Sequence, residues 1–245
     1  MRYVFATARY ALRDRDDCAA CWVPMSLMKE VSMLSAEEAL ERLKRGNHDF
    51  VTVRAHERDL SSERIEELYA YGQNPFAVVV SCADSRTVPE HMFMMGLGDL
   101  FVVRTAGNVV GPVELASVVY ACEHLGVKLV LVVGHTGCGA IQATIEACGC
   151  GDSVGGDTAG GDTACGEGTR SDDDRQTDVM APLTAPIACA IGDERDPYRA
   201  SERNVRAGMA ALASCPQLAD LCDRKGLRIA GAVYHTHSGV VDFLE

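Results

Sequence analysis

The sequence lacks any apolar run long enough to cross a membrane. A spanning helix needs about 20 consecutive apolar residues, whereas the longest candidate, residues 127–134, is much shorter and contains Lys128. We interpret that run as a buried strand and expect no membrane partner. Apolar residues nevertheless make up 47% of the 245 positions, which is enough to bury a substantial core.

Positive charge is also scarce. The formal net charge is −12, and a strongly acidic chain repels phosphate backbones, so nucleic acid is not an expected partner. The charge is unevenly spread, because residues 148–178 contain eight acids and two bases and so carry half of the total. The rest of the chain has an ordinary, mildly acidic surface.

The features of a secreted disulfide scaffold are missing as well. The chain has eleven cysteines, an odd number, and no segment typical of a signal peptide. We therefore expect reduced thiols in a cytoplasmic protein, with some of them as metal ligands. Residues 1–34 have weak periodicity and contain several acids, whereas transit peptides are poor in acids. We interpret these residues as a leader of doubtful order.

Residues 148–178 interrupt the pattern of the chain. They contain eight glycines and a tandem repeat, GGDTA-GGDTA, with almost no large apolar side chain. Such a composition cannot form a core, so we expect a mobile insertion. Its Gly-Asp spacing matches no calcium-binding loop. We therefore predict one domain over residues 35–245 that carries this insertion.

Helix signals are clear in the first part of that domain. Ser35 and Glu38 form a capping box, which begins a helix that we expect to end near Gly46. A second helix begins near Ser62 and stops at Gly72. Both precede the first strand signal.

Short aliphatic runs without polar alternation predict strands buried on both faces, at residues 77–81, 100–104 and 129–133. Helical stretches separate them, including one over roughly 113–125 after Pro112. This order favours a parallel sheet with crossover helices. The runs at 227–234 and 240–244 predict a further strand pair. The expected fold is α/β, with a central, mainly parallel β-sheet flanked by helices and an antiparallel C-terminal strand.

Reactive side chains follow two of these strands. The first strand ends at Cys82, and the third leads into His135 and Cys138. Because the carboxyl ends of parallel strands meet at one edge of a sheet, we expect these three side chains to converge. Two thiolates and an imidazole suit zinc, and three protein ligands leave a fourth position for water, as in catalytic sites. The sequence thus predicts one Zn²⁺ per chain.

Asp84 lies two residues after Cys82 and two before Arg86. In an extended segment alternate side chains share a face, so Arg86 can hold Asp84 in a bidentate pair. Released from Arg86, Asp84 can itself become the fourth ligand. We therefore count Asp84 among the candidate metal ligands, and Asp84 with Arg86 as the candidate catalytic residues.

The residues alone leave alternatives open. A cysteine at a strand end is often inert core, and the spacing of His135 and Cys138 also occurs in structural zinc sites. Structural zinc, packed cysteines and redox thiols all remain alternatives to a catalytic metal at this point.

The segments at 82–86 and 135–139 resemble the signature pair of β-class carbonic anhydrases. Other stretches are similar to the same family: Gly46–Phe50, Gly98–Asn108, Tyr120–Gly126, Asn204–Arg206 and Gly231–Tyr234. The likeness covers about residues 35–147 and 180–245. The insertion has no counterpart in the family pattern.

The resemblance implies reversible hydration of carbon dioxide to bicarbonate and a proton on zinc. It implies Cys82, His135 and Cys138 as ligands, with Asp84 and Arg86 as a gating pair. It also implies a homodimer or a higher homo-oligomer, in which the N-terminal helices embrace the neighbouring subunit.

Within the family, the chain resembles the plant-like subgroup, and this implies four substrate-binding residues. Gln73 matches a glutamine that hydrogen-bonds substrate, while Phe101 and Tyr120 match pocket residues often supplied across a dimer interface. Ala106 stands where a larger apolar residue is often found, which predicts a wider pocket. From the residues alone, Gln73 would be a loop amide and the two aromatic residues would be core.

Two other functions remain open at this stage. A hydrolase of carbon disulfide or carbonyl sulfide would use the same scaffold and the same ligands. A non-catalytic zinc protein would also keep the ligands, although the presence of every motif residue counts against it.

Overall fold

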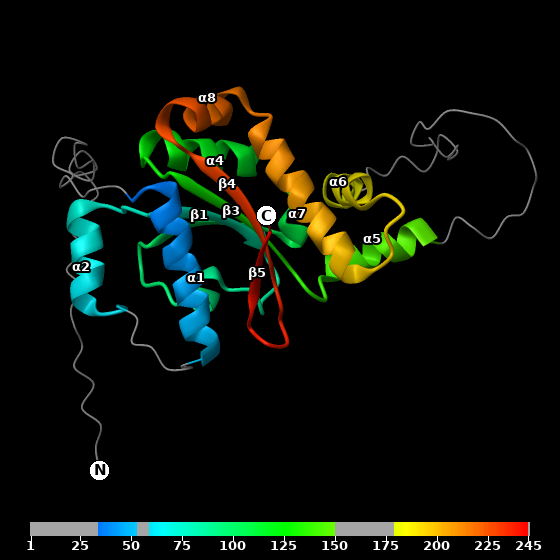
Figure 1. Ribbon diagram of the computed structural model, residues 1–245, viewed down its shortest axis with the longest axis horizontal. Helices are drawn as coiled ribbons and strands as arrows, with labels where there is room; N and C mark the ends of the chain where they lie inside the picture. Colours follow the sequence, from blue (N-terminus) through cyan, green and yellow to red (C-terminus); the bar gives the residue numbers. More distant parts are fainter. Residues whose placement is uncertain (1–33, 53–58, 150–178, 245) are drawn as a thin grey trace, which may run out of the picture.

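The structure is a computed structural model that describes residues 34–52, 59–149 and 179–244 (Figure 1). Nearly all of the expected leader and of the expected insertion lies outside these residues. None of the described helices is long and apolar enough to cross a membrane.

The described residues form one five-stranded sheet in the order β2-β1-β3-β4-β5. Its strands are β1 (Ala77–Cys82), β2 (Leu100–Thr105), β3 (Leu129–His135), β4 (Arg228–Tyr234) and β5 (Val241–Leu244). The first four are parallel, and β5 pairs antiparallel with β4. This confirms the expected α/β fold. Strands β1 and β3 are buried along their whole length, which explains their unbroken aliphatic sequence.

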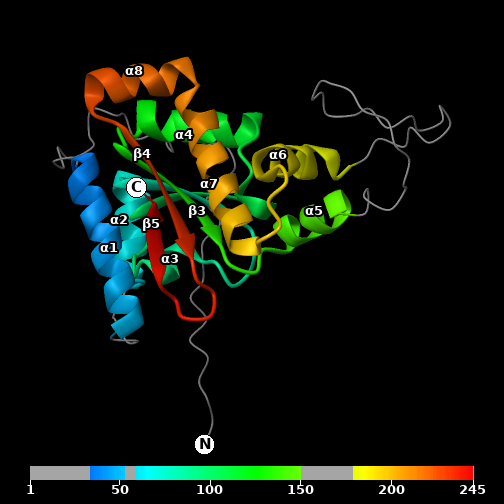
Figure 2. The same cartoon turned by 45° about the vertical axis from the view of Figure 1, so that its right-hand side comes forward.

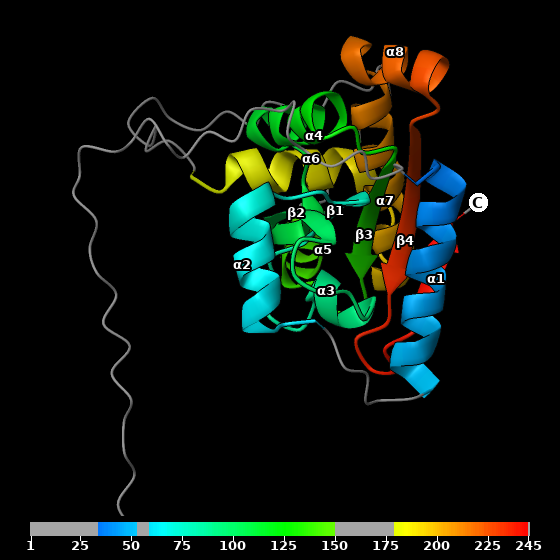
Figure 3. The same cartoon turned by 90° about the vertical axis from the view of Figure 1, so that its left-hand side faces the viewer.

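Helices cover both faces of this sheet. They are α1 (Ala36–Thr52), α2 (Ser62–Tyr71), α3 (Pro89–Met92), α4 (Pro112–His124), α5 (Gly139–Gly149), α6 (Ala181–Ile191), α7 (Pro197–Ala213) and α8 (Pro216–Lys225). Leu43 of α1 and Phe93 pack on one face, whereas Val118 of α4, Leu212 of α7 and Leu218 of α8 pack on the other. Figure 3 accordingly shows α1 and α7 on opposite sides of β4.

A smaller core lies beyond the carboxyl ends of the strands. Helices α5 and α6 lie side by side there (Figure 2). Ile141 of α5 and Ile187 of α6 form this core together with Cys82 and Cys138. The two cysteines are therefore held by a packed apolar shell rather than by loops alone.

Helix α1 is longer than the sequence predicts, and its expected end near Gly46 is wrong. The capping box is present, since Glu38 N–H donates to Ser35 Oγ at 3.2 Å and Ser35 N–H donates to Glu38 Oε2 at 2.8 Å. The helix continues through Gly46 to Thr52, and the glycine is required there because a Cβ would lie 1.8 Å from the carbonyl oxygen of Phe93. This glycine permits a close approach of two segments and does not end the helix.

Candidate metal centre

Three potential metal ligands converge at the carboxyl edge of the sheet. Cys82 and His135 are the last residues of β1 and β3, and Cys138 directly precedes α5. Their ligand atoms all lie within 4.8 Å of one another, and the two sulfur atoms are 4.0 Å apart. All three side chains are buried. The structure thus brings together the three residues that the sequence singles out.

His135 is prepared to bind a metal through Nε2. Its Nδ1 faces the carbonyl oxygen of Thr136 at 3.0 Å, an arrangement that places the proton on Nδ1. The lone pair of Nε2 is then free, and this atom is buried with no hydrogen-bond partner in the described residues. A buried polar atom without a partner is costly, and a metal ion satisfies it. The donor set therefore fits zinc.

The environment of Cys82 favours a thiolate. Cys138 Sγ hydrogen-bonds to Cys82 Sγ, and the backbone N–H groups of Asp84 and Gly107 point at the same sulfur at 3.4 and 3.3 Å. These contacts, with the Cys138 bond as the largest cause, lower the pKa of Cys82 to about 4. The neighbouring thiolate and burial raise the pKa of Cys138. Without a cation, the Cys82 thiolate therefore disfavours a second thiolate at Cys138. A divalent cation removes this repulsion, because it stabilises two thiolates at once.

Asp84 stands beside these ligands and is held by Arg86. Arg86 Nε donates to Asp84 Oδ1 at 3.0 Å, and Arg86 Nη2 donates to Asp84 Oδ2 at 2.7 Å. Oδ2 lies 3.9 Å from His135 Nε2. The hydrogen bond from Arg86 is the main cause that holds the pKa of Asp84 well below its usual value. The carboxylate is therefore charged and adjacent to the metal centre.

The backbone that produces this pair is a turn and not the extended segment that the sequence suggests. Thr87 N–H donates to the carbonyl oxygen of Asp84 at 3.0 Å and closes the turn. Thr87 Oγ1 also donates to the carbonyl oxygens of Asp84 and Cys82, at 2.9 and 3.0 Å. The bidentate geometry is thus fixed by the turn together with the Thr87 hydroxyl.

Sequence reasoning assigned no role to Arg104, which contacts this turn. Its Nε donates to the carbonyl oxygen of Cys82 at 3.0 Å, and its Nη2 donates to that of Asp84 at 2.7 Å. Arg104 lies on β2, where the strand register pairs it with Ser81. The sequence does place Arg104 near the end of a predicted strand. It does not show that this strand lies next to β1, which only the strand order reveals.

The four expected substrate-binding residues are not brought together in one chain. Ala106 begins the short 3-10 helix η3 (Ala106–Asn108) and directly precedes Gly107, which contacts Cys82. Phe101 instead pairs with Val78, four residues before Cys82. At about 3.3 Å per residue this separates Phe101 from Cys82 by about 13 Å along the sheet.

Tyr120 and Gln73 lie toward the amino ends of the strands, away from Cys82. The ring of Tyr120 contacts that of Phe101, with centroids 6.3 Å apart, and Tyr120 is 47% exposed. Gln73 is an exposed residue between α2 and β1. Their roles in substrate binding stay predictions.

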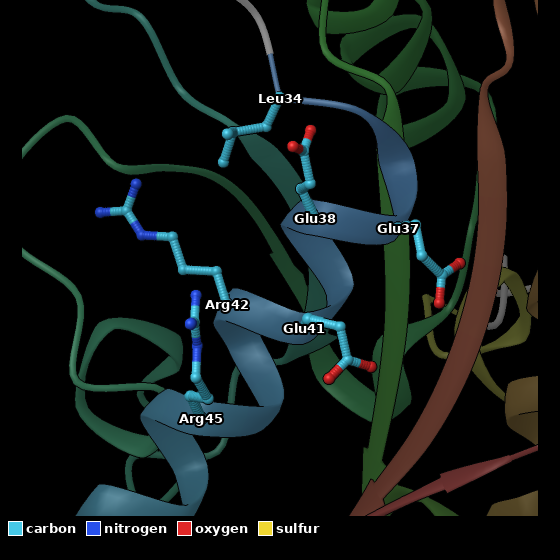
Figure 4. A pocket seen from close by; sticks show the side chains of 6 residues that line it. All are labelled: Leu34, Glu37, Glu38, Glu41, Arg42 and Arg45. Atoms are coloured by element: carbon cyan, nitrogen blue, oxygen red, sulfur yellow. The ribbon is translucent and has the colours of Figure 1, made fainter.

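An open groove of about 610 Å³ lies elsewhere, along the first half of α1 (Figure 4). Its lining residues are Leu34, Glu37, Glu38, Glu41, Arg42 and Arg45. Glu37 pairs with Arg228, the first residue of β4, at 2.6 Å. The groove is therefore at the amino edge of the sheet, opposite the metal centre, and contains charges of both signs.

Comparisons with known proteins agree with this geometry. The family model described as carbonic anhydrase matches residues 77–241. Carbonic anhydrase 2 of Mycobacterium tuberculosis is 45% identical over 118 residues, which cover 48% of this chain and 56% of that protein. The carbonic anhydrase of Pseudomonas aeruginosa is 33% identical over 179 residues, which cover 71% of this chain and 74% of that protein.

The match thus spans little more than half the length of the mycobacterial relative. Among solved structures, a tetrameric β-carbonic anhydrase from Sordaria macrospora has a TM-score of 0.57 at 23% identity, covering 82% of this chain and 93% of that one. It supports the fold. Together with the family match across the sheet and the Cys82, His135 and Cys138 ligand group, these findings show that the chain belongs to the β-carbonic anhydrase family.

Proposed function

We propose that this chain catalyses the reversible, zinc-dependent hydration of carbon dioxide to bicarbonate and a proton. The observation that supports this most is the buried donor set of Cys82, His135 and Cys138, within 4.8 Å of one another, beside a charged Asp84. A closed structural zinc site has four protein ligands, whereas in the part of the chain that the structure describes three donors converge. A donor set of this kind belongs to an open metal site.

Each residue of the centre has a distinct task in this proposal. Cys82 and Cys138 hold the metal through sulfur, and His135 holds it through Nε2. A zinc ion held by these three residues would act as a Lewis acid, which would let a water molecule ionise near neutral pH. Asp84 accepts a hydrogen bond from the reacting water and so orients it. Arg86 keeps both oxygens of Asp84 engaged, and an Asp84 released from Arg86 would be a candidate fourth ligand that would close the site.

We further propose that the substrate pocket is completed by a second copy of the chain, as in the plant-like subgroup. Phe101 and Tyr120 lie at the opposite end of the sheet from their own Cys82, which supports a role in a neighbour's site. Gln73 belongs to the same end, whereas Ala106 belongs to the chain's own site. In that case the homo-oligomer that the family resemblance implies is needed to complete the catalytic site.

A reducing compartment suits this centre, and we propose the cytoplasm. The seven cysteines of the described residues are all free thiols. Two of them are the proposed ligands, and oxidation of Cys82 with Cys138 would destroy the site.

The test is a joint measurement of zinc content and gas hydration on the purified full chain. We expect one zinc per chain and rapid carbon dioxide hydration, with both lost in a His135→Ala variant. Parallel assays on carbon disulfide and carbonyl sulfide should show no comparable turnover. A zinc-loaded chain that hydrates no carbon dioxide would refute the proposal.

A further inference from the structure

One face of helix α7 contacts two segments at the metal centre, the end of β3 that carries His135 and the η3 turn that touches Cys82. Ser201 Oγ donates to the carbonyl oxygen of His135 at 3.2 Å, and Asn204 Nδ2 donates to that of Gly107 at 2.8 Å. Residues three apart in a helix lie on the same face. Both side chains are buried, with exposed fractions of 0% and 5%. Helix α7 therefore touches both the end of β3 and the turn next to Cys82.

Gly107 links this helix to the metal centre. Its carbonyl oxygen accepts from Asn204, and its N–H donates to Cys82 Sγ at 3.3 Å. The residue is enclosed, because a Cβ here would lie 2.7 Å from Ile187 Cδ1. Any shift of Gly107 therefore changes the hydrogen bond that its N–H gives to the sulfur.

The turn that contains Gly107 needs an external anchor. Gly107 has φ 63° and the following Asn108 has φ 47°, so two consecutive residues are left-handed. For Asn108, which carries a Cβ, this conformation is less favourable than for glycine, and such a turn is held in place by its surroundings. The hydrogen bond from Asn204 to the carbonyl oxygen of Gly107 is such a constraint.

We propose that Asn204 is a positioning residue of the metal centre, which acts through Gly107 to fix the sulfur of Cys82 for metal binding. The inference rests on the proposed function because it assumes that Cys82 binds zinc. Asn204 touches no ligand atom itself. Its effect is on the affinity and electronic environment of the metal, through a second layer of hydrogen bonds.

Asn204→Asp is the sharpest variant, since it keeps the size of the side chain but replaces the donor with an acceptor facing the carbonyl oxygen of Gly107. We expect zinc affinity, measured by competition with a chelator on the full chain, to fall about 10–100-fold. In the Co²⁺-loaded protein, the sulfur-to-metal charge-transfer band should shift or weaken. Asn204→Ala should change both readouts in the same direction.

Asn47→Ala is the matched control. Asn47 is also buried, at 6% exposed, and makes more hydrogen bonds: Nδ2 donates to the carbonyl oxygens of Met92 and Gly239, and Oδ1 accepts from Val241 N–H. It lies on α1, on the other face of the sheet from α7. This variant should lower the melting temperature and leave zinc affinity and the charge-transfer band as in the unchanged chain.

Either of two results would overturn the inference. One is an Asn204→Asp chain that binds zinc as tightly as the unchanged chain with the same spectrum. The other is an Asn47→Ala chain that loses zinc affinity equally, since that would reflect stability alone. A wild-type chain that binds zinc but hydrates no carbon dioxide would refute the proposed function. The zinc affinities and spectra of the Asn204 and Asn47 variants would still decide whether Asn204 positions Cys82.

Discussion

Arg86 binds both carboxylate oxygens of Asp84, at 3.0 and 2.7 Å, and so holds a negative charge 3.9 Å from the metal-binding nitrogen of His135. Arg86 Nη2 also donates to the carbonyl oxygen of Gly137 at 3.0 Å, one residue before Cys138. The guanidinium therefore connects the two ligand-bearing loops. A lysine could not make this set of contacts, because it lacks the planar fork of donors.

Asp84→Asn tests the role of this charge. The amide keeps the shape of the side chain, but it removes the negative charge and the acceptor at one position. We expect carbon dioxide hydration, followed by stopped-flow, to fall about 10–100-fold with the zinc content unchanged. Asp193→Asn is the control, because Asp193 forms an ion pair with Arg203 at 3.3 Å but is 98% exposed. An unchanged rate in Asp84→Asn would favour a non-catalytic or indirect role.

Mixed oligomers test whether the pocket is shared between subunits. A Cys82→Ala chain and a Tyr120→Ala chain each lack one part of the proposed site. If the parts come from different subunits, co-refolded mixtures regain activity, because half of the dimers are mixed and each has one intact site. We expect about a quarter of the wild-type rate for a two-fold symmetric dimer. Mixtures no more active than their components would place Tyr120 outside the neighbour's site.

Gly46→Ala tests the close approach of α1 to Phe93 at Gly46. The added methyl group would meet the carbonyl oxygen of Phe93, at 1.8 Å before any relaxation. We expect a loss of about 1–3 kcal/mol in the free energy of unfolding in urea. Gly139→Ala in α5 is the control, since nothing lies within 4 Å of a Cβ there. It should stay within about 0.5 kcal/mol of the unchanged chain, because the position is exposed at the start of α5; equal losses in the two variants would contradict the argument.

Cys122 should resist alkylation in the folded protein. Burial, with a smaller effect of Cys222, raises the pKa of Cys122 to about 12. The unreactive thiol therefore persists in the folded chain as the pH rises toward 12, whereas an unfolded cysteine ionises near pH 8.5. Iodoacetamide at pH 8 should label the exposed Cys148 and Cys189 and spare Cys122, with sites mapped by mass spectrometry. Urea should expose Cys122, and rapid labelling without urea would count against its burial.

Some of these features could be predicted from local sequence. The aliphatic runs of β1 and β3 specify buried strands, and the strand-end rule then brings Cys82 and His135 to one edge of the sheet. Cys138 follows because it lies three residues after His135. Such inferences succeed because strand burial and short spacings depend on neighbouring residues in the chain.

The sequence by itself determined the α/β sheet and the three converging ligands, since hydrophobic pattern and chain order are enough to set them. Only the tertiary structure shows that Gly46 serves a close approach to Phe93 inside α1 and does not end the helix. It alone placed Arg104 on the carbonyl oxygens of Cys82 and Asp84, and Asn204 on Gly107, 97 positions away. Contacts between distant segments depend on strand order and helix packing, and no local pattern encodes them.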